Sequence, residues 1–278
     1  MLPEELAQRV WPGRPVELEP LGGGITNRNF RAVVDGESFV LRIGGVDAEL
    51  LGIDREAEHE ASRVAAELGI GPEVVAFVDG NLVTRYVEGE VGRAAPAEVG
   101  RMLRRLHDGP PLRGRFDAFR VVEAYAATAL ARGVALPAGY TEAKQLADRV
   151  EARRAEPTPR PCHDDLLPAN FVHDGERVWL VDWEYAGMGD PYFDLANFAV
   201  NAGLDEAGER ELLDAYGGGD HEALVLMRFL SDLREAMWGV VQQALSELDF
   251  DFRAYADEHF ERLEHTARTA RFHAALCP

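Results

Sequence analysis

The chain has 278 residues, a length that allows one large domain or two lobes around a cleft. Its net charge of -20 disfavours binding to nucleic acid or to anionic membranes. Apolar residues make up 46% of the chain without forming a membrane-length run, and the first twenty residues carry no apolar signal core. We therefore expect a cytoplasmic protein, with its two cysteines, Cys162 and Cys277, as reduced thiols.

Strands around one main helix are predicted for the first 90 residues. A short strand, Val16–Leu21, precedes Gly22-Gly23-Gly24. Two hairpins are predicted from Asp-Gly turns, Arg28–Val34 with Ser38–Ile43 and Val74–Val78 with Leu82–Val87. Between them, Asp54 is expected to cap a helix that ends at Gly69.

Helices dominate the rest of the chain after a predicted linker at Glu88–Glu90. They are expected near 97–107, 119–132, 141–154, 192–202, 206–216, 222–248 and 252–275, with a short β segment over 170–183. A turn at Asp174-Gly175 would fold the two ends of this segment, with Asn170 and Asp182, toward each other. The pattern predicts an α+β fold with two lobes, an antiparallel β lobe with one main helix over residues 1–87 and a larger helical lobe over residues 88–278. A ligand cleft is expected between them.

One segment carries the residues needed for phosphoryl transfer. His163, Asp165 and Asn170 form a His-x-Asp-x4-Asn pattern, and Asp182 follows twelve residues later. Such a reaction requires a carboxylate that accepts the proton of the attacking hydroxyl, together with oxygen ligands for Mg²⁺. We interpret Asp165 as the catalytic carboxylate and Asn170 and Asp182 as magnesium ligands. Each residue alone has an ordinary structural explanation, but the combined spacing favours a kinase.

Five stretches of the chain resemble the aminoglycoside phosphotransferase and choline kinase superfamily, and bacterial choline/ethanolamine kinase-like proteins in particular. The similar stretches are LGGGITNRNF (21–30), FVLRI (39–43), IDREAE (53–58), CHDDLLPANF (162–171) and VDWEYAGMGDPYFDLA (181–196). The resemblance implies a bilobal protein-kinase-like fold with ATP, accompanied by Mg²⁺, in the cleft between the lobes.

Nucleotide-binding residues are carried over from this resemblance. The glycine-rich loop with its flanking polar residues, Gly22, Gly23, Gly24, Thr26 and Asn27, would fold over the phosphates. Arg42 stands where protein kinases place a phosphate-binding lysine, and the sole lysine, Lys144, lies far from that strand. Glu58 is the favoured acidic partner of Arg42, with Glu56 and Glu60 as alternatives. Backbone groups of Arg85, Tyr86 and Val87 would meet the adenine.

The substrate side is expected to suit a small amine. Glu184 follows the magnesium aspartate, and the resemblance places Trp238 and Tyr255 as aromatic walls of an ammonium site. Glu235 stands where the family often has a second tryptophan, which favours a hydrogen-bonding amine such as ethanolamine over choline. Aromatic residues at helical spacing are also common in protein cores. We interpret His163 and Asp194 as supports of the catalytic loop.

Three functions follow from the sequence. The favoured one is an ATP- and magnesium-dependent kinase acting on the hydroxyl of a small, cationic amino alcohol. The alternatives are a kinase of the same superfamily acting on an aminoglycoside, thiamine or a sugar, and an inactive nucleotide-binding module. The intact Asp165, Asn170 and Asp182 argue against the inactive module. The expected partner is a small-molecule substrate, without nucleic acid or membrane, and the sequence leaves the oligomeric state open.

Overall fold

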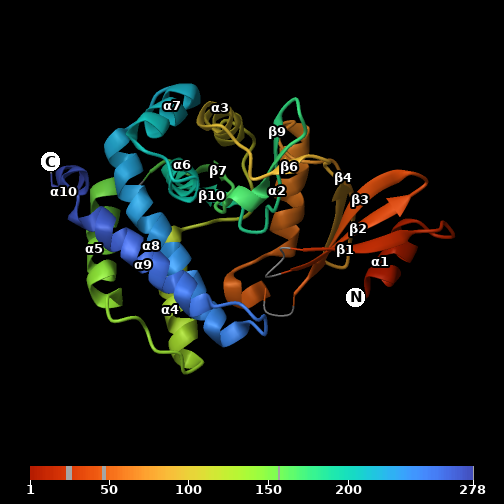
Figure 1. The fold of residues 1–278 in the computed structure, drawn as a ribbon, viewed down its shortest axis with the longest axis horizontal. Coiled ribbons are helices and arrows are strands. Elements are labelled where there is room, and N and C mark those ends of the chain that lie inside the picture. The colour runs from red at the N-terminus through yellow and green to blue at the C-terminus, as the bar shows by residue number, and fades with distance from the viewer. Residues whose placement is uncertain (23–26, 46–47, 156, 278) are drawn as a thin grey trace.

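The computed structural model describes residues 1–22, 27–45, 48–155 and 157–277, and these form a sheet-containing lobe beside a larger helical lobe (Figure 1). The mixed α+β architecture predicted from the sequence is confirmed. Among the described residues, no helix is both long enough and apolar enough to cross a membrane.

The smaller lobe is built on an antiparallel sheet with strand order β1-β2-β3-β5-β4. Its strands are β1 (Glu17–Leu21), β2 (Asn27–Val34), β3 (Glu37–Gly44), β4 (Val74–Val78) and β5 (Asn81–Arg85). Both predicted Asp-Gly turns are present, and all four turn residues, Asp35, Gly36, Asp79 and Gly80, have positive φ angles of 49–83°. Such φ values match the twist of tight hairpins, which is why the local sequence predicted these turns.

The two faces of the sheet have different partners. Because side chains alternate along a strand, Leu41 and Ile43 of β3 point into a small apolar core, whereas Arg42 points to the opposite face. The core is closed by α1 (Pro3–Val10) through Leu6 and Ala7. Helix α1 is not predicted from the sequence, because its eight residues give too short an apolar pattern.

The expected helix of the first lobe is α2 (Arg55–Glu67), which follows the 3-10 turn η1 (Ala48–Leu51). Asp54 caps it by accepting hydrogen bonds from the backbone amides of Glu56 and Ala57. Three of its buried apolar residues, Ala61, Val64 and Ala65, belong to the core of the helical lobe. The helix thus connects the sheet, which carries Arg42, to the helical lobe.

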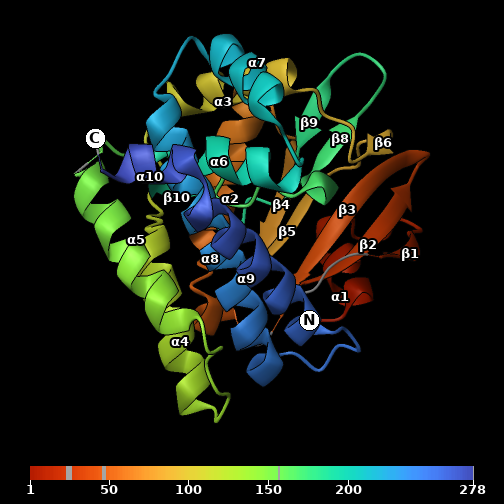
Figure 2. The same cartoon turned by 60° about the vertical axis from the view of Figure 1, so that its left-hand side comes forward.

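Helices surround the core of the second lobe. They are α3 (Pro96–His107), α4 (Ala118–Ala131), α5 (Tyr140–Arg154), α6 (Pro191–Asn201), α7 (Glu206–Tyr216), α8 (His221–Leu245), α9 (Phe252–Arg268) and α10 (Ala270–Leu276). The long helix α8 lies beside α9 and packs against α4 and α6 (Figure 2). The single last helix predicted over 252–275 is divided at Thr269, whose extended backbone and side-chain cap start α10.

Short strands carry the catalytic segments. They are β6 (Glu90–Val91), β7 (Arg160–Cys162), β8 (Phe171–His173), β9 (Val178–Leu180) and β10 (Gly187–Gly189), with the 3-10 turn η2 (Pro168–Asn170) before β8. The predicted linker therefore ends in a strand, because Glu90 pairs with His173 at the open edge of the β8–β9 hairpin.

Candidate active site

The loop after β7 is held by one aspartate of α6. Asp194 accepts hydrogen bonds from the backbone amides of His163 (2.9 Å) and Asp164 (2.7 Å), and Asp164 has a left-handed φ of 67°. Asn197, one turn further along α6, accepts from the backbone amide of Leu166. These contacts give the loop before Asp165 a fixed path.

His163 connects this loop to the segment before Asp182. Its Nδ1 accepts from the backbone amide of Asp165 (3.3 Å), and its Nε2 lies 3.0 Å from the carbonyl oxygen of Val181. Burial lowers the pKa of His163 to about 4. The neutral ring with a proton on Nε2 satisfies both contacts, so the histidine bridges two loops without carrying charge.

Asp165 lies buried at the end of the loop. Asn170 donates from Nδ2 to the Asp165 backbone carbonyl (2.8 Å) and to its Oδ2 (3.2 Å). The other carboxylate oxygen, Oδ1, lies 3.1 Å from Nη1 of Arg234. Burial raises the pKa of Asp165 to about 7, against the effect of Arg234. A carboxylate with a pKa in this range can accept a proton near neutral pH.

The β8–β9 hairpin brings Asn170 next to Asp182. The backbone amide of Val181 donates to the carbonyl of Asn170 (3.0 Å), and Phe171 pairs with Leu180 above it. The expected turn at Asp174-Gly175 closes this hairpin: Asp174 accepts from the backbone amides of Glu176 and Arg177. The two predicted magnesium ligands thus lie at the same end of one hairpin, as the turn predicted.

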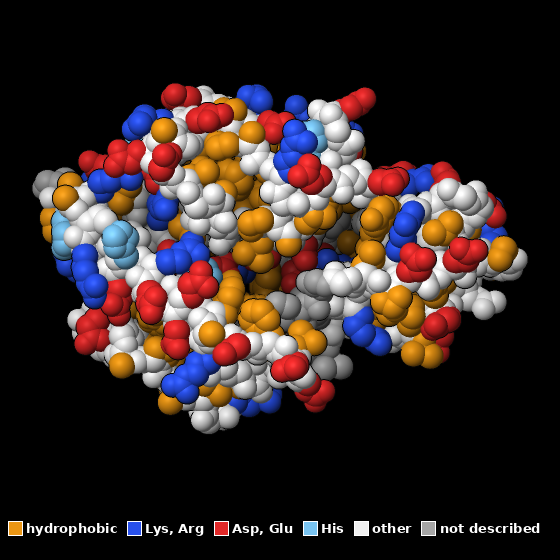
Figure 3. Space-filling view, viewed as in Figure 1, with side chains coloured by type: hydrophobic (Ala, Val, Ile, Leu, Met, Phe, Trp, Pro, Cys, Tyr) orange, Lys and Arg blue, Asp and Glu red, His pale blue; other side chains and the backbone are white. Residues whose placement is uncertain are grey.

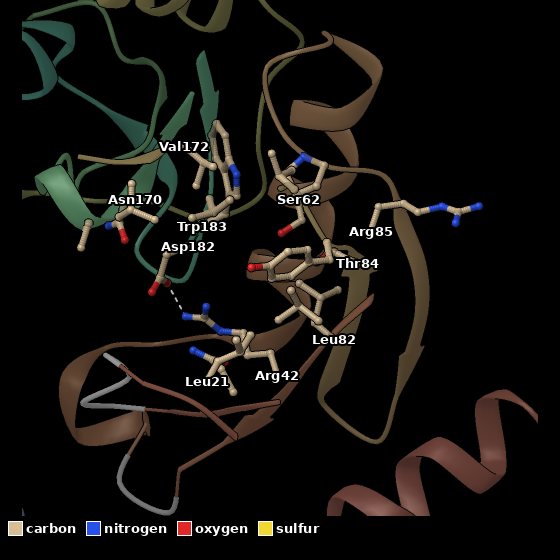
Figure 4. A pocket seen from close by; sticks show the side chains of 18 of the residues that line it. Leu21, Arg42, Ser62, Leu82, Thr84, Arg85, Asn170, Val172, Asp182 and Trp183 are labelled. Carbon is tan, nitrogen blue, oxygen red and sulfur yellow. Dashed lines mark hydrogen bonds and ion pairs between the residues drawn. The ribbon is translucent and has the colours of Figure 1, made fainter. Parts of the chain in front are cut away.

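A cavity of about 410 Å³ lies between the sheet, α2 and this hairpin. Its lining includes Gly22, Arg42, Glu58, Asn170, Asp182 and the segment 85–87. Arg42 and Asp182 point toward one another across the cavity, while the Arg85 side chain points away from it (Figure 4). Arg85 pairs with Glu37 (2.8 Å) and Glu73 (3.2 Å), so only its backbone remains a candidate for binding adenine. Gly23, Gly24 and Thr26 of the expected loop lie outside the described residues.

Arg42 is the centre of a cluster that we call the phosphate-side cluster: Asn27, Arg42, Arg55, Glu58, Asp182 and Glu184. Its Nε lies 2.7 Å from Oε1 of Glu58, so Glu58 is the glutamate of α2 that pairs with Arg42. Its Nη2 contacts Asp182 and lies 3.2 Å from Oε2 of Glu184. Against the effect of burial, these three carboxylates raise the pKa of Arg42 well above its ordinary value.

Arg55 completes this cluster from the start of α2. It lies 2.7 Å from Glu58 Oε2 and 3.3 Å from Glu184 Oε2, and it donates to Oδ1 of Asn27 (2.7 Å). Asn27 in turn donates from Nδ2 to Oε2 of Glu184 (2.7 Å). The structure therefore places Glu184, expected at the substrate, against two guanidinium groups and the strand that follows the glycine-rich loop.

The remaining predicted substrate residues lie together on α8 and α9. Tyr255 donates its hydroxyl to Oε2 of Glu235 (2.9 Å), and its ring lies 5.5 Å from that of Trp238. Glu235 Oε1 accepts from Nη1 of Arg234 (2.7 Å), the same nitrogen that contacts Asp165. We call Asp165, Arg234, Glu235 and Tyr255 the base-side cluster. Trp238 lies one helical turn beyond Arg234, on the same face of α8.

The charge balance of the two clusters fits a divalent cation. Five carboxylates (Glu58, Asp165, Asp182, Glu184 and Glu235) accompany three guanidinium groups (Arg42, Arg55 and Arg234). Burial raises the pKa of Asp182 to about 6, with Glu184 and Glu58 adding to this against Arg42. Acidic side chains are visible on the floor of the hollow between the lobes (Figure 3). The side chains of Asn170 and Asp182 carry oxygen atoms of the hard kind that Mg²⁺ prefers.

Sequence reasoning missed three residues of the site: Arg55, Asn197 and Arg234. Arg55 lies inside the IDREAE stretch, three residues before Glu58, so an i,i+3 ion pair was a usable signal. Arg234 and Asn197 lie within long apolar helices and give no comparable signal. A polar residue in such a helix is expected to be exposed unless the elements packed against the helix are known.

Together, the fold and the candidate site are those of a kinase-like small-molecule phosphotransferase. The family model described as "Phosphotransferase enzyme family" matches residues 17–233, and the chain belongs to this family. It is an enzyme, a small-molecule kinase of the aminoglycoside phosphotransferase and choline kinase group.

Individual relatives agree with this assignment. A choline/ethanolamine kinase family protein from Mesorhizobium loti superposes with a TM-score of 0.82 at 34% identity, over 98% of this chain and 97% of that one. Choline kinase LicA from Streptococcus pneumoniae gives a TM-score of 0.81 at 24% identity over 95% and 96%, and LicA has also been solved with AMP. Protein LicA of Haemophilus influenzae is 28% identical over 86% of this chain and 99% of its own length.

Proposed function

We propose that this protein transfers the γ-phosphoryl group of ATP, with Mg²⁺, to the hydroxyl of a small amine. The observation that carries this proposal is the convergence of Asn170, Asp182 and Arg42 on one cavity, with Asp165 hydrogen-bonded to Asn170. These are the groups that in-line phosphoryl transfer requires. The AMP complex of LicA supports the use of an adenine nucleotide.

Each residue has a distinct role in this proposal. Asp165 accepts the proton of the attacking hydroxyl, while Arg42 leaves Asp182 to pair with phosphate oxygens. Magnesium held by Asn170 and Asp182 would neutralise charge on the phosphates. Glu58 keeps the Arg42 side chain extended toward the cavity, because its carboxylate holds the Nε edge. The phosphates would be covered by the glycine-rich loop with its flanking polar residues, Gly22, Gly23, Gly24, Thr26 and Asn27. The adenine would be held by the backbone of Arg85, Tyr86 and Val87.

A cationic acceptor is supported by the aromatic pair on α8 and α9. Trp238 follows Arg234 by one turn of α8, and Tyr255 contacts Glu235, which pairs with Arg234. Because Arg234 also contacts Asp165, an acceptor at Asp165 would extend toward the two rings. Each aromatic face attracts a desolvated cation by about 0.5–2 kcal/mol. Because Glu184 and Glu235 are both paired with arginines, we assign the recognition of the amine mainly to these rings.

A substrate screen tests the proposal. ADP release is measured with ATP and Mg²⁺ over amino alcohols, aminoglycosides, thiamine and sugars, and Asp165→Asn serves as the inactive control. We expect the highest kcat/KM for choline or ethanolamine. A neutral sugar as the best acceptor would remove the amine proposal, and ADP release that equals the control for every acceptor would remove the kinase proposal.

A further inference from the structure

A continuous series of buried polar contacts runs from α9 to the catalytic carboxylate. The Tyr255 hydroxyl donates to Glu235 (2.9 Å), and Nη1 of Arg234 bridges Glu235 (2.7 Å) and Oδ1 of Asp165 (3.1 Å). The series therefore links α9, α8 and the catalytic loop, and it reaches the carboxylate oxygen that Asn170 does not contact.

Asn197 attaches the same series to the catalytic loop at a second point. Its Nδ2 lies 3.3 Å from Oε1 of Glu235, while its Oδ1 accepts from the backbone amide of Leu166, the residue after Asp165. A displacement of Glu235 would therefore affect both the Asp165 side chain, through Arg234, and the backbone beside it.

Packing alone does not explain why an arginine occupies this position. Arg234 and Glu235 are each 1% exposed, and the guanidinium lies 4.7 Å from the centre of the Tyr185 ring and 5.8 Å from that of Phe116. Its Nε and Nη2 have no hydrogen-bond partner within the described part of the chain. Buried donors without partners are destabilising, and apolar residues of similar volume often replace a buried ion pair without loss of stability.

The contacts at Asp165 point to a positioning role. One carboxylate oxygen contacts Arg234 and the other contacts Nδ2 of Asn170, so rotation of the carboxylate about its last bond is restricted from both sides. Proton transfer needs the carboxylate within hydrogen-bond reach of the substrate hydroxyl. We infer that Tyr255, Glu235 and Arg234 are positioning residues that fix the orientation of the Asp165 carboxylate for phosphoryl transfer.

The inference rests on the proposed kinase activity and gives Tyr255 a second task beside the contact of its ring with the acceptor. Tyr255→Phe separates the two tasks, because it keeps the aromatic ring and removes only the hydroxyl. We expect kcat to fall about 10-fold, with the KM values for ATP and for the acceptor within about 2-fold of wild type, since a small misplacement of a reacting group lowers kcat strongly.

Three further variants show whether the residues act as one unit. Arg234→Met is expected to lower kcat by about 10²-fold, and Arg234→Lys to recover part of this loss because it restores one positive charge. For the double variant Tyr255→Phe with Glu235→Gln, we expect a loss smaller than the product of the two single losses, as for residues in one network.

Arg262→Met is the matched control. Arg262 also connects α9 to α8, with its Nε 3.2 Å from Asp232, but it does not belong to the base-side cluster. We expect this variant to keep the wild-type kcat even where its melting temperature falls.

The outcomes are distinguishable. Wild-type kcat in Tyr255→Phe with a raised KM for the acceptor would overturn the inference and make the hydroxyl a substrate contact. Equal loss of kcat in Tyr255→Phe and Arg262→Met would also overturn it, because a general structural effect would then explain both. If Arg234→Met does not fold, Tyr255→Phe and Arg234→Lys decide. Wild-type protein without transfer to any acceptor would overturn the proposed function together with this inference.

Discussion

The two clusters at the site use the same chemistry in different structural settings. In each, a buried arginine bridges carboxylates: Arg42 joins Glu58, Asp182 and Glu184, and Arg234 joins Asp165 and Glu235. The phosphate-side cluster draws its members from the sheet, α2 and the segment after β9. The base-side cluster lies entirely within the helical lobe.

This difference has a functional consequence. Movement of the sheet relative to the helical lobe would change the phosphate-side cluster, because Arg42 and Asp182 come from different lobes. The base-side cluster would keep its geometry, because α8, α9 and the catalytic loop share one core. We therefore expect substitutions in the first cluster to affect nucleotide binding and substitutions in the second to affect the chemical step.

Replacement of the base should give the largest effect and the clearest separation. Asp165→Asn is expected to lower kcat by about 10²–10⁴-fold, because the hydroxyl loses its proton acceptor. Binding of ATP with Mg²⁺, measured by calorimetry, should stay within a few-fold of wild type. Near-normal kcat in this variant would contradict the role given to Asp165.

Asp182→Ala tests the phosphate-side cluster. We expect magnesium-dependent ATP binding to be lost, and Asn170→Ala to weaken it less, because an uncharged amide attracts the cation less strongly than a carboxylate. Titrations of ATP with Mg²⁺ and with EDTA measure this. Removing Mg²⁺ from wild type should reproduce the Asp182→Ala result, and equal affinity in all conditions would rule out Asp182 as a ligand.

Arg42→Met should raise the KM for ATP and lower kcat/KM by about 10²-fold, since a positively charged phosphate clamp is removed. Arg85→Met is the matched control, because Arg85 also lies on the sheet beside the cavity but pairs with Glu37 and Glu73 on the surface. Similar kinetic losses in the two variants would show that the Arg42 cluster has no specific role.

Glu184→Gln tests whether this carboxylate acts in nucleotide binding or in acceptor binding. Its contacts with Arg42, Arg55 and Asn27 predict a larger rise in the KM for ATP than in the KM for the amine acceptor. We expect a change of about 10-fold, the size of one charge-assisted hydrogen bond. A larger rise in the KM for the acceptor than in the KM for ATP would instead assign Glu184 to the acceptor site.

The pH dependence of kcat should give the smallest effect. Burial raises the pKa of Asp165 to about 7, so the ionised base is depleted as pH falls. Between pH 8 and pH 6.5 its ionised fraction falls from about 0.9 to about 0.24, and kcat should fall about 4-fold. A kcat that is constant over this range would show that the bound substrates restore an ordinary carboxylate pKa.

Features that depend on local spacing could be predicted from the amino-acid sequence. The Asp-Gly turns fixed the hairpins, because their residues adopt positive φ readily. The spacing of Asp165, Asn170 and Asp182 predicted a shared site. The turn at Asp174-Gly175 folds the chain back, so that Asn170 and Asp182 lie at the same end of one hairpin. Arg42 and Glu58 were predicted as a pair from a resemblance and from the helical period of α2, and they lie in contact.

Contacts between charged residues far apart in the chain depend on how the elements pack, and the sequence pattern does not show them. Glu184 lies two residues after Asp182, yet the close approach of β2 and α2 brings it to Asn27 and Arg55. Arg234 lies 69 residues from Asp165, on a helix whose pattern indicates only burial. The period of a helix fixes which side chains share a face, whereas the partner of that face depends on how the helices pack. The sequence could therefore predict a candidate base, Asp165, and the packing of α8 and α9 brought the residues that contact it.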